Sequence, residues 1–471
     1  MCIRDSPQTE PSTKKNCPDN PSSRTPSSDF SFAPTESELA AAPEPGKANN
    51  ITKGRDDSPN VFKTLVPHVL FFIPKWTFAA IMWPIREGLY SLDRYDLAGK
   101  VGALLSGDAP ITLYPSAIVV AGQGVTLGFG VEYKKYIRGR FLFGGEARRI
   151  FAGRVRTRDL LGSSFELDAE IEHQRLRNTI FAGIGNGALQ SGPLSSPLID
   201  PLTDETAFET RFDQNVTRIE VGANLSIIKH LQLRFSGAYL RRRFDEDGPD
   251  DTSSIPLQDF YDTTNLVAFN SGFDQAYGEL RFIFDNRIQP SPWMSTALPT
   301  RGWKVTGFGG RTHSINDNHE DYTRLGLDVQ RYQHLFGGNR ILIIRTQTEW
   351  VSAGVGEIPF VDLAQPAGSI ILRGYRRGRF RDRMSLLNSL EYRFPINRQI
   401  SGFLFLDAGT VARTPGELDI GNLHYGTGIG LHVHTADRLL IRLQAAGGED
   451  GLVFNASFKS SDRVRKTTKR R

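Results

Sequence analysis

The stretch FELDAEIE, residues 165–172, alternates apolar and acidic side chains at every position. This period of two is typical of a β-strand, because successive side chains then lie on opposite faces. Four carboxylates on one face of a single strand could not be satisfied inside an apolar core. The stretch therefore indicates a strand with an apolar environment on one side and a wet or salt-linked environment on the other. The acidic face comprises Glu166, Asp168, Glu170 and Glu172.

The same alternation recurs almost to the end of the chain. About fifteen such segments lie between residues 112 and 459, and most are close to the roughly 10 residues that a tilted membrane strand needs. Strands of soluble sandwiches are usually shorter, about 5–6 residues. The pattern predicts an all-β fold, a transmembrane antiparallel β-barrel. Examples are VTLGFGVEY at 125–133, IEVGANLSI at 219–227, YGTGIGLHV at 425–433 and LVFNASFK at 452–459.

The bulk composition excludes several other classes of protein. The chain has 471 residues, of which 39% are hydrophobic, and its mean hydropathy of −0.33 excludes a bundle of membrane helices. A barrel is compatible with this value because every second residue of its strands faces the lumen. Both cysteines, Cys2 and Cys17, precede the strand pattern. The folded part therefore has neither a disulfide framework nor a cysteine-based metal site.

Four segments follow one another along the chain. Residues 1–59 are rich in polar residues and proline and are predicted to be a disordered tail. Residues 60–110 read as short amphipathic helices broken by prolines, lying either at the membrane interface or as ordinary packed helices. Residues 111–459 form the predicted outer-membrane barrel. Residues 460–471 are a basic tail, better explained by solvation than by nucleic-acid binding, and no nucleic-acid partner is expected.

The most specific stretch lies in a long predicted loop and includes Arg373, Gly374 and Tyr375. A glycine beside an arginine permits a tight turn that presents the guanidinium. Inside a closed lumen this cation must find carboxylates. The next two predicted strands offer Glu391 and Asp407. Glu391 has the opposite parity to the lipid-type residues of its strand, so we expect it to face inward.

These residues resemble the bacterial surface antigen family, the BamA/TamA-like barrels of the outer-membrane assembly and translocation superfamily. The family marker is an Arg-Gly-Tyr/Phe tripeptide on the sixth extracellular loop, which Arg373, Gly374 and Tyr375 match. The resemblance implies that this loop folds back into the lumen and that Arg373 pairs with Glu391 and Asp407. It covers roughly residues 111–459 and implies sixteen strands.

Three further stretches carry the same resemblance. FDNR at 284–287, followed by PTRG at 299–302, is similar to the mid-barrel signature of the family, and FAGIGN at 181–186 is similar to another recurrent stretch. The last strand, with Gly451, Phe454 and Phe458, looks like the aromatic-ended signal that the barrel assembly machinery recognises during biogenesis. That machinery and the outer-membrane lipids are therefore the expected partners, in the bacterial cell outer membrane.

The sequence departs from the family in three respects. Residues 61–110 are too short for an array of POTRA domains, so we expect periplasmic or outer-membrane protein partners to supply what such domains do. The chain continues past Phe458 with a basic tail. The opening MCIRDSPQTE has no apolar region of a secretory signal, although an outer-membrane protein requires export.

Three groups of residues could suggest a metal site, a catalytic site or an interfacial role. His424, His432 and His434 share one face of one strand, but same-face residues of a strand are widely spaced and no cysteine is near, so no metal site is expected. The four acids of 166–172 are better explained as a hydrated lumen wall than as paired catalytic carboxylates. Trp303 and Trp350, near strand ends, suit an interfacial aromatic girdle. No catalytic residue, enzyme activity or cofactor is predicted.

Three functions remain open at this point. The first is a membrane-embedded member of the assembly and translocation superfamily, and the second is a diffusion channel or purely structural barrel. The third, less favoured, is a barrel-embedded enzyme. For Arg373 itself, a structural role in holding the loop is favoured over direct participation in transport, because removing one partner of a buried ion pair leaves an uncompensated charge.

Overall fold

The computed structural model describes residues 111–458, all of which lie in the compact unit Lys100–Arg471. The predicted tail, the predicted amphipathic segment and the basic tail fall outside the described residues, so the proposed division of the chain into these segments stays a prediction. Short gaps interrupt the description at 121–123, 135, 145–147, 161–163, 188–197, 203–206, 246–254, 289–297, 336–339, 369–370, 397–399 and 435–438.

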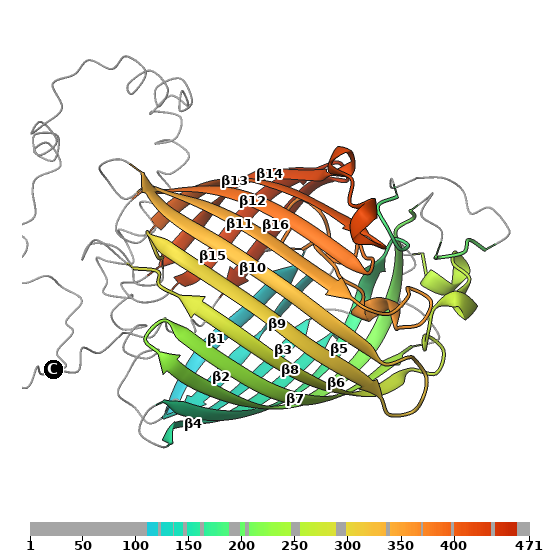
Figure 1. The fold of residues 1–471 in the computed structure, drawn as a ribbon, viewed down its shortest axis with the longest axis horizontal. Coiled ribbons are helices and arrows are strands. Elements are labelled where there is room, and N and C mark those ends of the chain that lie inside the picture. The colour runs from blue at the N-terminus through green and yellow to red at the C-terminus, as the bar shows by residue number, and fades with distance from the viewer. Residues whose placement is uncertain are drawn as a thin grey trace, which may run out of the picture. The chain divides into compact units, whose positions relative to one another are not determined.

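The described residues form a closed antiparallel barrel, as predicted (Figure 1). Each strand pairs with its neighbours in the sequence, and the first pairs with the last. The strands are β1 Ile111–Val120, β2 Gly124–Tyr133, β3 Ile137–Gly144, β4 Arg149–Leu160, β5 Phe165–Phe181, β6 Thr210–Ile228, β7 Leu231–Phe244, β8 Phe273–Asp285, β9 Gly302–Ser314, β10 Tyr322–Leu335, β11 Arg340–Val351, β12 Met384–Pro395, β13 Ile400–Ala412, β14 His424–His434, β15 Leu439–Gly448 and β16 Gly451–Phe458.

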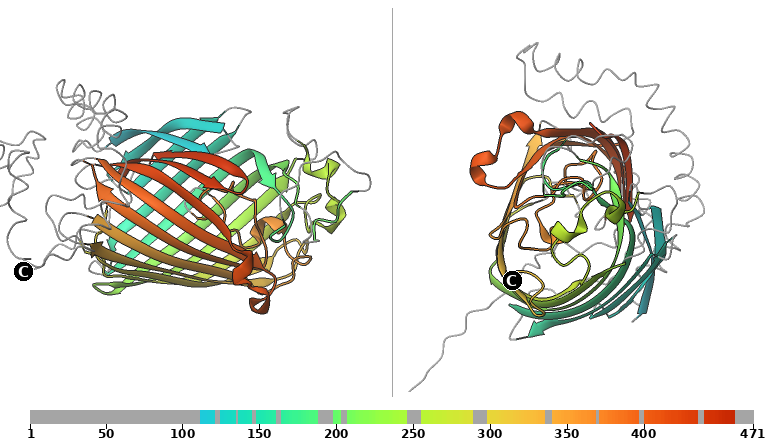
Figure 2. Two further views of the ribbon diagram at one scale, coloured as in Figure 1. Left: turned by 90° about the horizontal axis from the view of Figure 1, so that it is seen from above. Right: turned by 90° about the vertical axis from the view of Figure 1, so that its right-hand side faces the viewer.

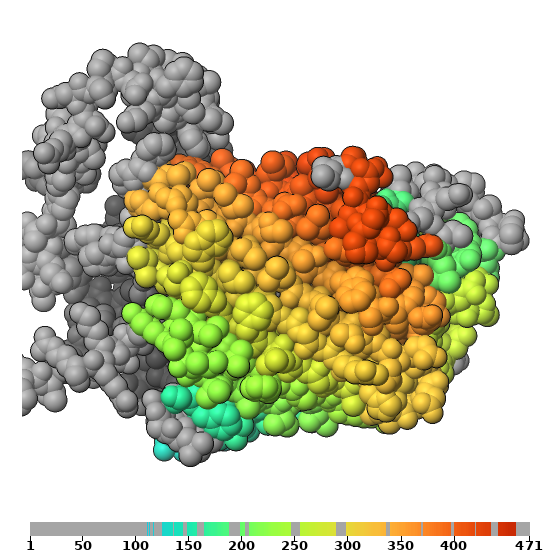
Figure 3. Space-filling view, viewed as in Figure 1, coloured from blue at the N-terminus to red at the C-terminus, as the bar shows by residue number. Residues whose placement is uncertain are grey.

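The alternation in the sequence corresponds to two faces of the barrel wall. On β5, Ile171 is 53% exposed on the outer face, whereas Asp168 is 4% exposed on the inner face. The outward side chains of β7 to β13 form a continuous surface in the view of Figure 3. Large apolar side chains dominate this outer face, which is what contact with hydrocarbon requires.

The two ends of the barrel differ in their connections. At one end the strands are joined by residues 182–209, 245–272 and 352–383, and at the other end mostly by short turns such as 229–230. Outer-membrane barrels have short periplasmic turns and longer extracellular loops. The end with the long loops is therefore extracellular, and β12 runs from the extracellular to the periplasmic side.

The described parts of the long loops contain short 3-10 helices and fold over and into the barrel. Figure 2 shows loop segments inside the ring of strands when the barrel is viewed along its axis. No helix in the described part of the chain is long and apolar enough to span a membrane. The 3-10 helices are η2 Leu257–Asp259, η3 Thr263–Asn265, η4 Phe360–Asp362, η5 Pro415–Glu417 and η6 Ile420–Asn422.

The pairing that closes the barrel is shorter than its neighbours. Between β1 and β16 the register joins Ile118 to Ser457 and Val119 to Ala456. Between β1 and β2 it runs over the full length of β1, and between β15 and β16 over the full length of β16. Among the residues that the structure describes, the junction of β1 with β16, which we call the seam, therefore has the shortest strand pairing.

Candidate functional site

The loop between β11 and β12 enters the lumen through a set of backbone conformations that few residues adopt. Leu372 has φ 40°, Gly374 has φ 107° and Gly378 has φ 93°. A Cβ on Gly374 would lie 2.8 Å from the carbonyl oxygen of Gly447, so this position requires glycine on two grounds. The turn places Arg373 and Tyr375 against the inner wall formed by β12 to β15.

Arg373 binds both carboxylates that the sequence analysis singled out. Its Nε and Nη2 donate to the two oxygens of Asp407 at 2.8 and 2.7 Å, a bidentate arrangement. Its Nη1 donates to Oε2 of Glu391 at 2.6 Å. The side chain of Arg373 is 3% exposed and that of Asp407 is 1% exposed. The structure thus brings the three residues together in a buried, charge-assisted cluster.

The same cluster contains two arginines that the sequence analysis did not connect to the loop. Arg393 Nη2 lies 2.9 Å from Glu391 Oε1, and Arg442 Nη2 lies 3.4 Å from Oε2. Glu391 is therefore shared by three guanidiniums, whereas Asp407 is bound mainly by Arg373. The parity of Arg393 with Glu391 could have revealed the first of these arginines, but Arg442 lies on a more distant strand.

Tyr375 links the loop to the last hairpins of the barrel. Its hydroxyl donates to the carbonyl oxygen of Tyr425 at 3.2 Å and accepts from the backbone N–H of Glu449 at 3.3 Å. Its ring packs edge-on against Phe380 at 5.0 Å. A Cβ on Gly448 would lie 2.9 Å from this ring, so the glycine leaves room for the tyrosine.

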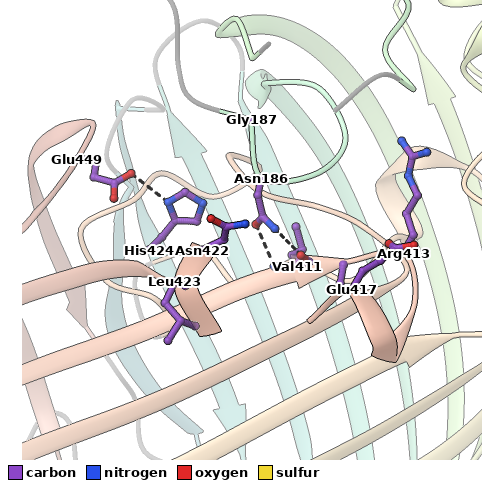
Figure 4. Close-up of a pocket in the computed structure, with 11 residues that line it drawn as sticks. Asn186, Gly187, Val411, Arg413, Glu417, Asn422, Leu423, His424 and Glu449 are labelled. Carbon is purple, nitrogen blue, oxygen red and sulfur yellow. Dashed lines mark hydrogen bonds and ion pairs between the residues drawn. The ribbon is translucent and has the colours of Figure 1, made fainter. Parts of the chain in front are cut away.

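The FAGIGN stretch after β5 meets the same loop. Gly185 donates its backbone N–H to the carbonyl oxygen of Arg381 at 2.8 Å. The amide side chain of Asn186 accepts from the backbone N–H of Val411 at 3.0 Å and donates to the carbonyl oxygen of the same residue (Figure 4). Two stretches nearly 200 residues apart in the sequence are therefore joined at the extracellular end of β13.

A polar cavity of about 580 Å³ lies beside Asn186. Its wall includes Arg413 and His424, and His424 Nδ1 lies 3.0 Å from Glu449 (Figure 4). The other predicted histidines do not reach this wall. His432 stacks on Phe403 at 4.4 Å, and His434 contacts Ser401. Within the described ranges, no group of three or more His, Cys, Asp or Glu side chains is placed to hold a metal ion.

An apolar cluster, which we call the cap, lies at the extracellular end of the lumen. It combines ends of β5, β6, β10 and β11 with residues of three loops. Aromatic rings pack edge to face in its centre, where Phe181 and Phe360 lie 5.1 Å apart. No pattern in the sequence predicts the cap. Its buried members are Phe181, Ile184, Phe212, Leu257, Phe260, Tyr261, Leu266, Phe269, Tyr322, Val351, Ile358, Phe360 and Leu363.

Arg381, 1% exposed, lies between the cap and the loop. Its guanidinium donates to the carbonyl oxygens of Ile180 at 3.0 Å and Gly378 at 3.1 Å. It also lies 4.9 Å from the ring of Phe181 and 5.3 Å from that of Phe360. Carbonyl dipoles and ring faces thus solvate this buried cation.

Asp362, at the end of η4, is buried in the cap. Tyr322 donates its hydroxyl to Asp362 at 2.7 Å and Gln275 its amide at 3.0 Å. Burial raises the pKa of the Asp362 carboxyl, but Arg242 and Arg324 lower it more. The net effect is a pKa below the ordinary value, so this carboxyl is ionised at neutral pH.

Arginines on neighbouring strands bind the acidic face of β5. Asp168 lies 2.6 Å from Arg234 and 2.9 Å from Arg154. Arg234 also reaches Glu220 at 2.8 Å. The expectation that these acids face the lumen agrees with the structure. Sequence parity fixes the face of a residue and does not reveal its partner on the next strand.

The residues of the predicted terminal signal lie on the last strand. Gly451 begins β16 with φ 112° at the turn from β15. Phe454 is 62% exposed on the outer wall, and Phe458 pairs through its backbone with Ile441. Recognition of this strand by an assembly machinery stays a prediction. The predicted girdle residue Trp303 is 42% exposed at the periplasmic end of β9, 5.0 Å from the guanidinium of Arg331.

The comparisons with known proteins concern the same part of the chain. Residues 294–447 match the family model described as the Omp85 superfamily domain, and this range contains Arg373, Glu391 and Asp407. No curated protein matches the sequence. Among solved structures, the chain is similar to BamA from Haemophilus ducreyi lacking POTRA domains 1–3, with a TM-score of 0.51 and 12% identity over 74% of this chain and 70% of that chain.

Two weaker similarities are to CdiB from Acinetobacter baumannii and CdiB from Escherichia coli. Their TM-scores are 0.44 and 0.45, with 9% and 10% identity over 74% of this chain and 59% and 63% of theirs. The similarity to BamA concerns the fold. The chain therefore has the fold of an outer-membrane β-barrel, and residues 294–447 of it match the Omp85 superfamily domain.

Proposed function

We propose that this barrel acts in protein assembly into the outer membrane or in translocation across it, together with protein partners, and does not act as an open diffusion channel. The observation that carries the proposal is the loop of residues 352–383, which occupies the lumen and is anchored there by Arg373. A plugged lumen conducts solutes poorly. The Omp85 superfamily domain supports the same class of activity.

The seam supports a route through the wall. An unfolded client strand needs unpaired backbone groups, because hydrocarbon tolerates no unsatisfied N–H or C=O. The seam joins β1 to β16 at Ile118 with Ser457 and Val119 with Ala456, so opening it breaks few backbone hydrogen bonds. The exposed edges would then pair with a client strand.

A disulfide across the seam tests this route. Val119→Cys with Ala456→Cys joins directly paired positions, whose expected Cα separation of about 4.5–5.5 Å suits a disulfide. The matched control is Leu443→Cys with Ala456→Cys. It uses the same position on β16 but joins it to β15 instead of β1. In vesicles, we expect the reduced protein to shorten the folding time of a urea-unfolded outer-membrane barrel, measured by gel mobility without heating.

Oxidation of the seam pair should abolish this acceleration, and oxidation of the control pair should leave it. Equal acceleration by both oxidised proteins would contradict the seam route. Single-channel recording in a planar bilayer distinguishes assembly or translocation from a diffusion channel, because a stable open pore would favour the channel. Hydrolysis of lipid by the purified protein would favour a barrel-embedded enzyme.

We propose that Arg373 is an anchor of the loop and takes no direct part in transport. The support is its bidentate bond to Asp407 and its bond to Glu391, which leave the side chain 3% exposed. We also propose that β16, with Gly451, Phe454 and Phe458, is recognised by the barrel assembly machinery during biogenesis. Phe454→Ser should lower the amount of barrel in the outer membrane without changing its melting temperature once folded.

A further inference from the structure

Basic side chains line up on the outer wall across four neighbouring strands. In the register of the sheet, Arg149 on β4 lies opposite Arg175 on β5, Arg175 opposite Asn215 on β6, and Asn215 opposite Arg243 on β7. One row closer to the middle of the membrane, His173 lies opposite Thr217, which lies opposite Arg241. We call Arg149, His173, Arg175, Arg241 and Arg243 the rim patch.

The rim patch faces outward. His173 and Arg175 share the parity of the exposed residue Ile171, whereas Asp168 on the opposite parity faces the lumen. The side chain of Arg241 is 57% exposed, and those of Arg175 and Arg243 are each 34% exposed. These cations therefore reach whatever surrounds the barrel.

The height of the patch places it at the extracellular edge of the membrane. Arg175 follows Phe165, the first residue of β5 at the periplasmic end, by about ten positions, which is one membrane-crossing length of a tilted strand. Between them, the outward residues of β5 are apolar except His173. Arg149 is the first residue of β4, which begins at the extracellular end. The guanidiniums thus lie where the headgroups of the outer leaflet begin.

The charge of the patch is incompletely balanced by the described residues. Asp274 lies 2.9 Å from Arg243 and 3.9 Å from Arg241. Asp245 lies 3.8 Å from Arg175, but it also lies 3.7 Å from Arg177. In the described part of the chain, two carboxylates thus face the four arginines of the patch, and one of them is shared.

The pairing of Arg149 with Arg175 points to an anion. Like charges directly opposite each other on neighbouring strands are destabilising unless something compensates them. A guanidinium presents a planar fork of donors that matches the oxygens of a phosphate. Strands are spaced about 4.8 Å apart, so the row from Arg149 to Arg243 spans about 14 Å. That length accommodates a headgroup carrying more than one phosphate.

We propose that the rim patch binds the phosphate groups of a phosphorylated lipid in the outer leaflet. The bound lipid would fix the height of this wall in the membrane and compensate the repulsion between Arg149 and Arg175. An acidic protein would satisfy the same charges, but the patch lies directly beside apolar wall, where a ligand with acyl chains contacts both surfaces.

Native mass spectrometry of the detergent-purified full chain tests the proposal. The probes are bisphosphorylated lipid A and the same lipid after phosphatase treatment. The test variant is Arg149→Gln with Arg175→Gln and Arg243→Gln. The matched control removes three cations at the periplasmic end, through Lys229→Gln, Arg331→Gln and Arg340→Gln. We expect the wild type and the control to retain the phosphorylated lipid and the test variant to lose it by at least about tenfold, because each lost phosphate contact is charge-assisted.

Several results would overturn the proposal. They are equal retention of the dephosphorylated lipid by the wild type and equal retention of the phosphorylated lipid by the test variant. A further result that would overturn it is lipid binding that appears only after four acids of the β7–β8 connection are neutralised, because the chain itself would then occupy the patch. These acids are Glu246, Asp247, Asp250 and Asp251. Should the triple variant not fold, Arg149→Gln alone gives the same comparison, with a smaller loss expected.

Discussion

The substitution Arg373→Ala tests the central electrostatic lock of the lumen. It removes three hydrogen bonds to Asp407 and Glu391 from the guanidinium and a fourth to Ser389 at 3.0 Å. The two carboxylates do not lose the same share of their hydrogen-bond and ion-pair partners. Glu391 keeps Arg393 and Arg442, whereas Asp407 keeps the hydroxyl of Ser389 at 2.6 Å and the backbone N–H of residue 373 at 2.9 Å. Asp407 is therefore left as a buried charge without a cation.

Breaking a buried ion pair by removing one partner costs about 3–5 kcal/mol. At roughly 2 °C per kcal/mol for a large domain, the melting temperature should fall by about 6–10 °C. Adding Asp407→Asn should restore part of this loss, since the stranded charge is then neutralised. The melting temperature is measured in detergent by the heating step that converts the compact gel band into the unfolded band, and limited proteolysis reports release of the 352–383 loop.

The control is Arg331→Ala, which removes an arginine that contacts Trp303 on the outer wall rather than a buried carboxylate. It should change the melting temperature by no more than about 1–2 °C, as expected outside buried networks. The reasoning would be refuted if Arg373→Ala behaved like this control, or if Asp407→Asn lowered the stability of the Arg373→Ala protein further.

Gly426→Ala should also release the loop, because its Cβ would lie 1.8 Å from the carbonyl oxygen of Arg373. The control Gly447→Ala should be tolerated, because its Cβ would meet no atom within contact distance. Limited proteolysis of the loop compares the two variants. Arg381→Met should loosen the cap, because the hydrogen bonds from Arg381 to the carbonyl oxygens of Ile180 and Gly378 disappear. Uptake of small dyes into vesicles that contain the protein should then increase, and unchanged uptake would argue against a sealing role for Arg381. The pKa of the Asp362 carboxyl is lower in the folded protein than in the unfolded chain, where it is about 3.9. The ionised carboxyl therefore stabilises the fold fully at a pH above the unfolded pKa, and this stabilisation is lost as the pH falls through the folded pKa. Proteolysis of the cap should therefore be constant from pH 7 to 5 and rise below about pH 4, and Asp362→Asn should flatten that rise.

The barrel wall could be predicted from the sequence because its physical cause is local. Each residue faces lipid or lumen according to its parity, so FELDAEIE alone contains the argument for two environments. The anchoring of the loop by Arg373 could also be predicted. The family resemblance implied that the loop enters the lumen, where a cation requires carboxylates, and Glu391 and Asp407 supply them on the next two strands.

The cap and the cross-strand partners could not be predicted in this way. Phe181, Phe260 and Phe360 belong to separate loops and strand ends, and only the closed barrel brings them together. No periodicity connects them, because loop residues have no fixed parity. The same holds for Arg442, whose contact with Glu391 crosses from β15 to β12 through the lumen. Register within a hairpin follows from the turn, whereas contacts across a lumen depend on the number and tilt of all the strands.

Three arginines anchor the loop inside the barrel. Arg373 holds the loop to β12 and β13, Arg379 holds it to Asp450 at 2.8 Å, and Arg381 holds it to the cap. Withdrawing the loop would therefore break all three attachments together. Opening the seam requires only a few backbone hydrogen bonds to exchange with those of an incoming strand. On the proposed route, the opening therefore forms in the wall between β1 and β16 while the loop stays in place.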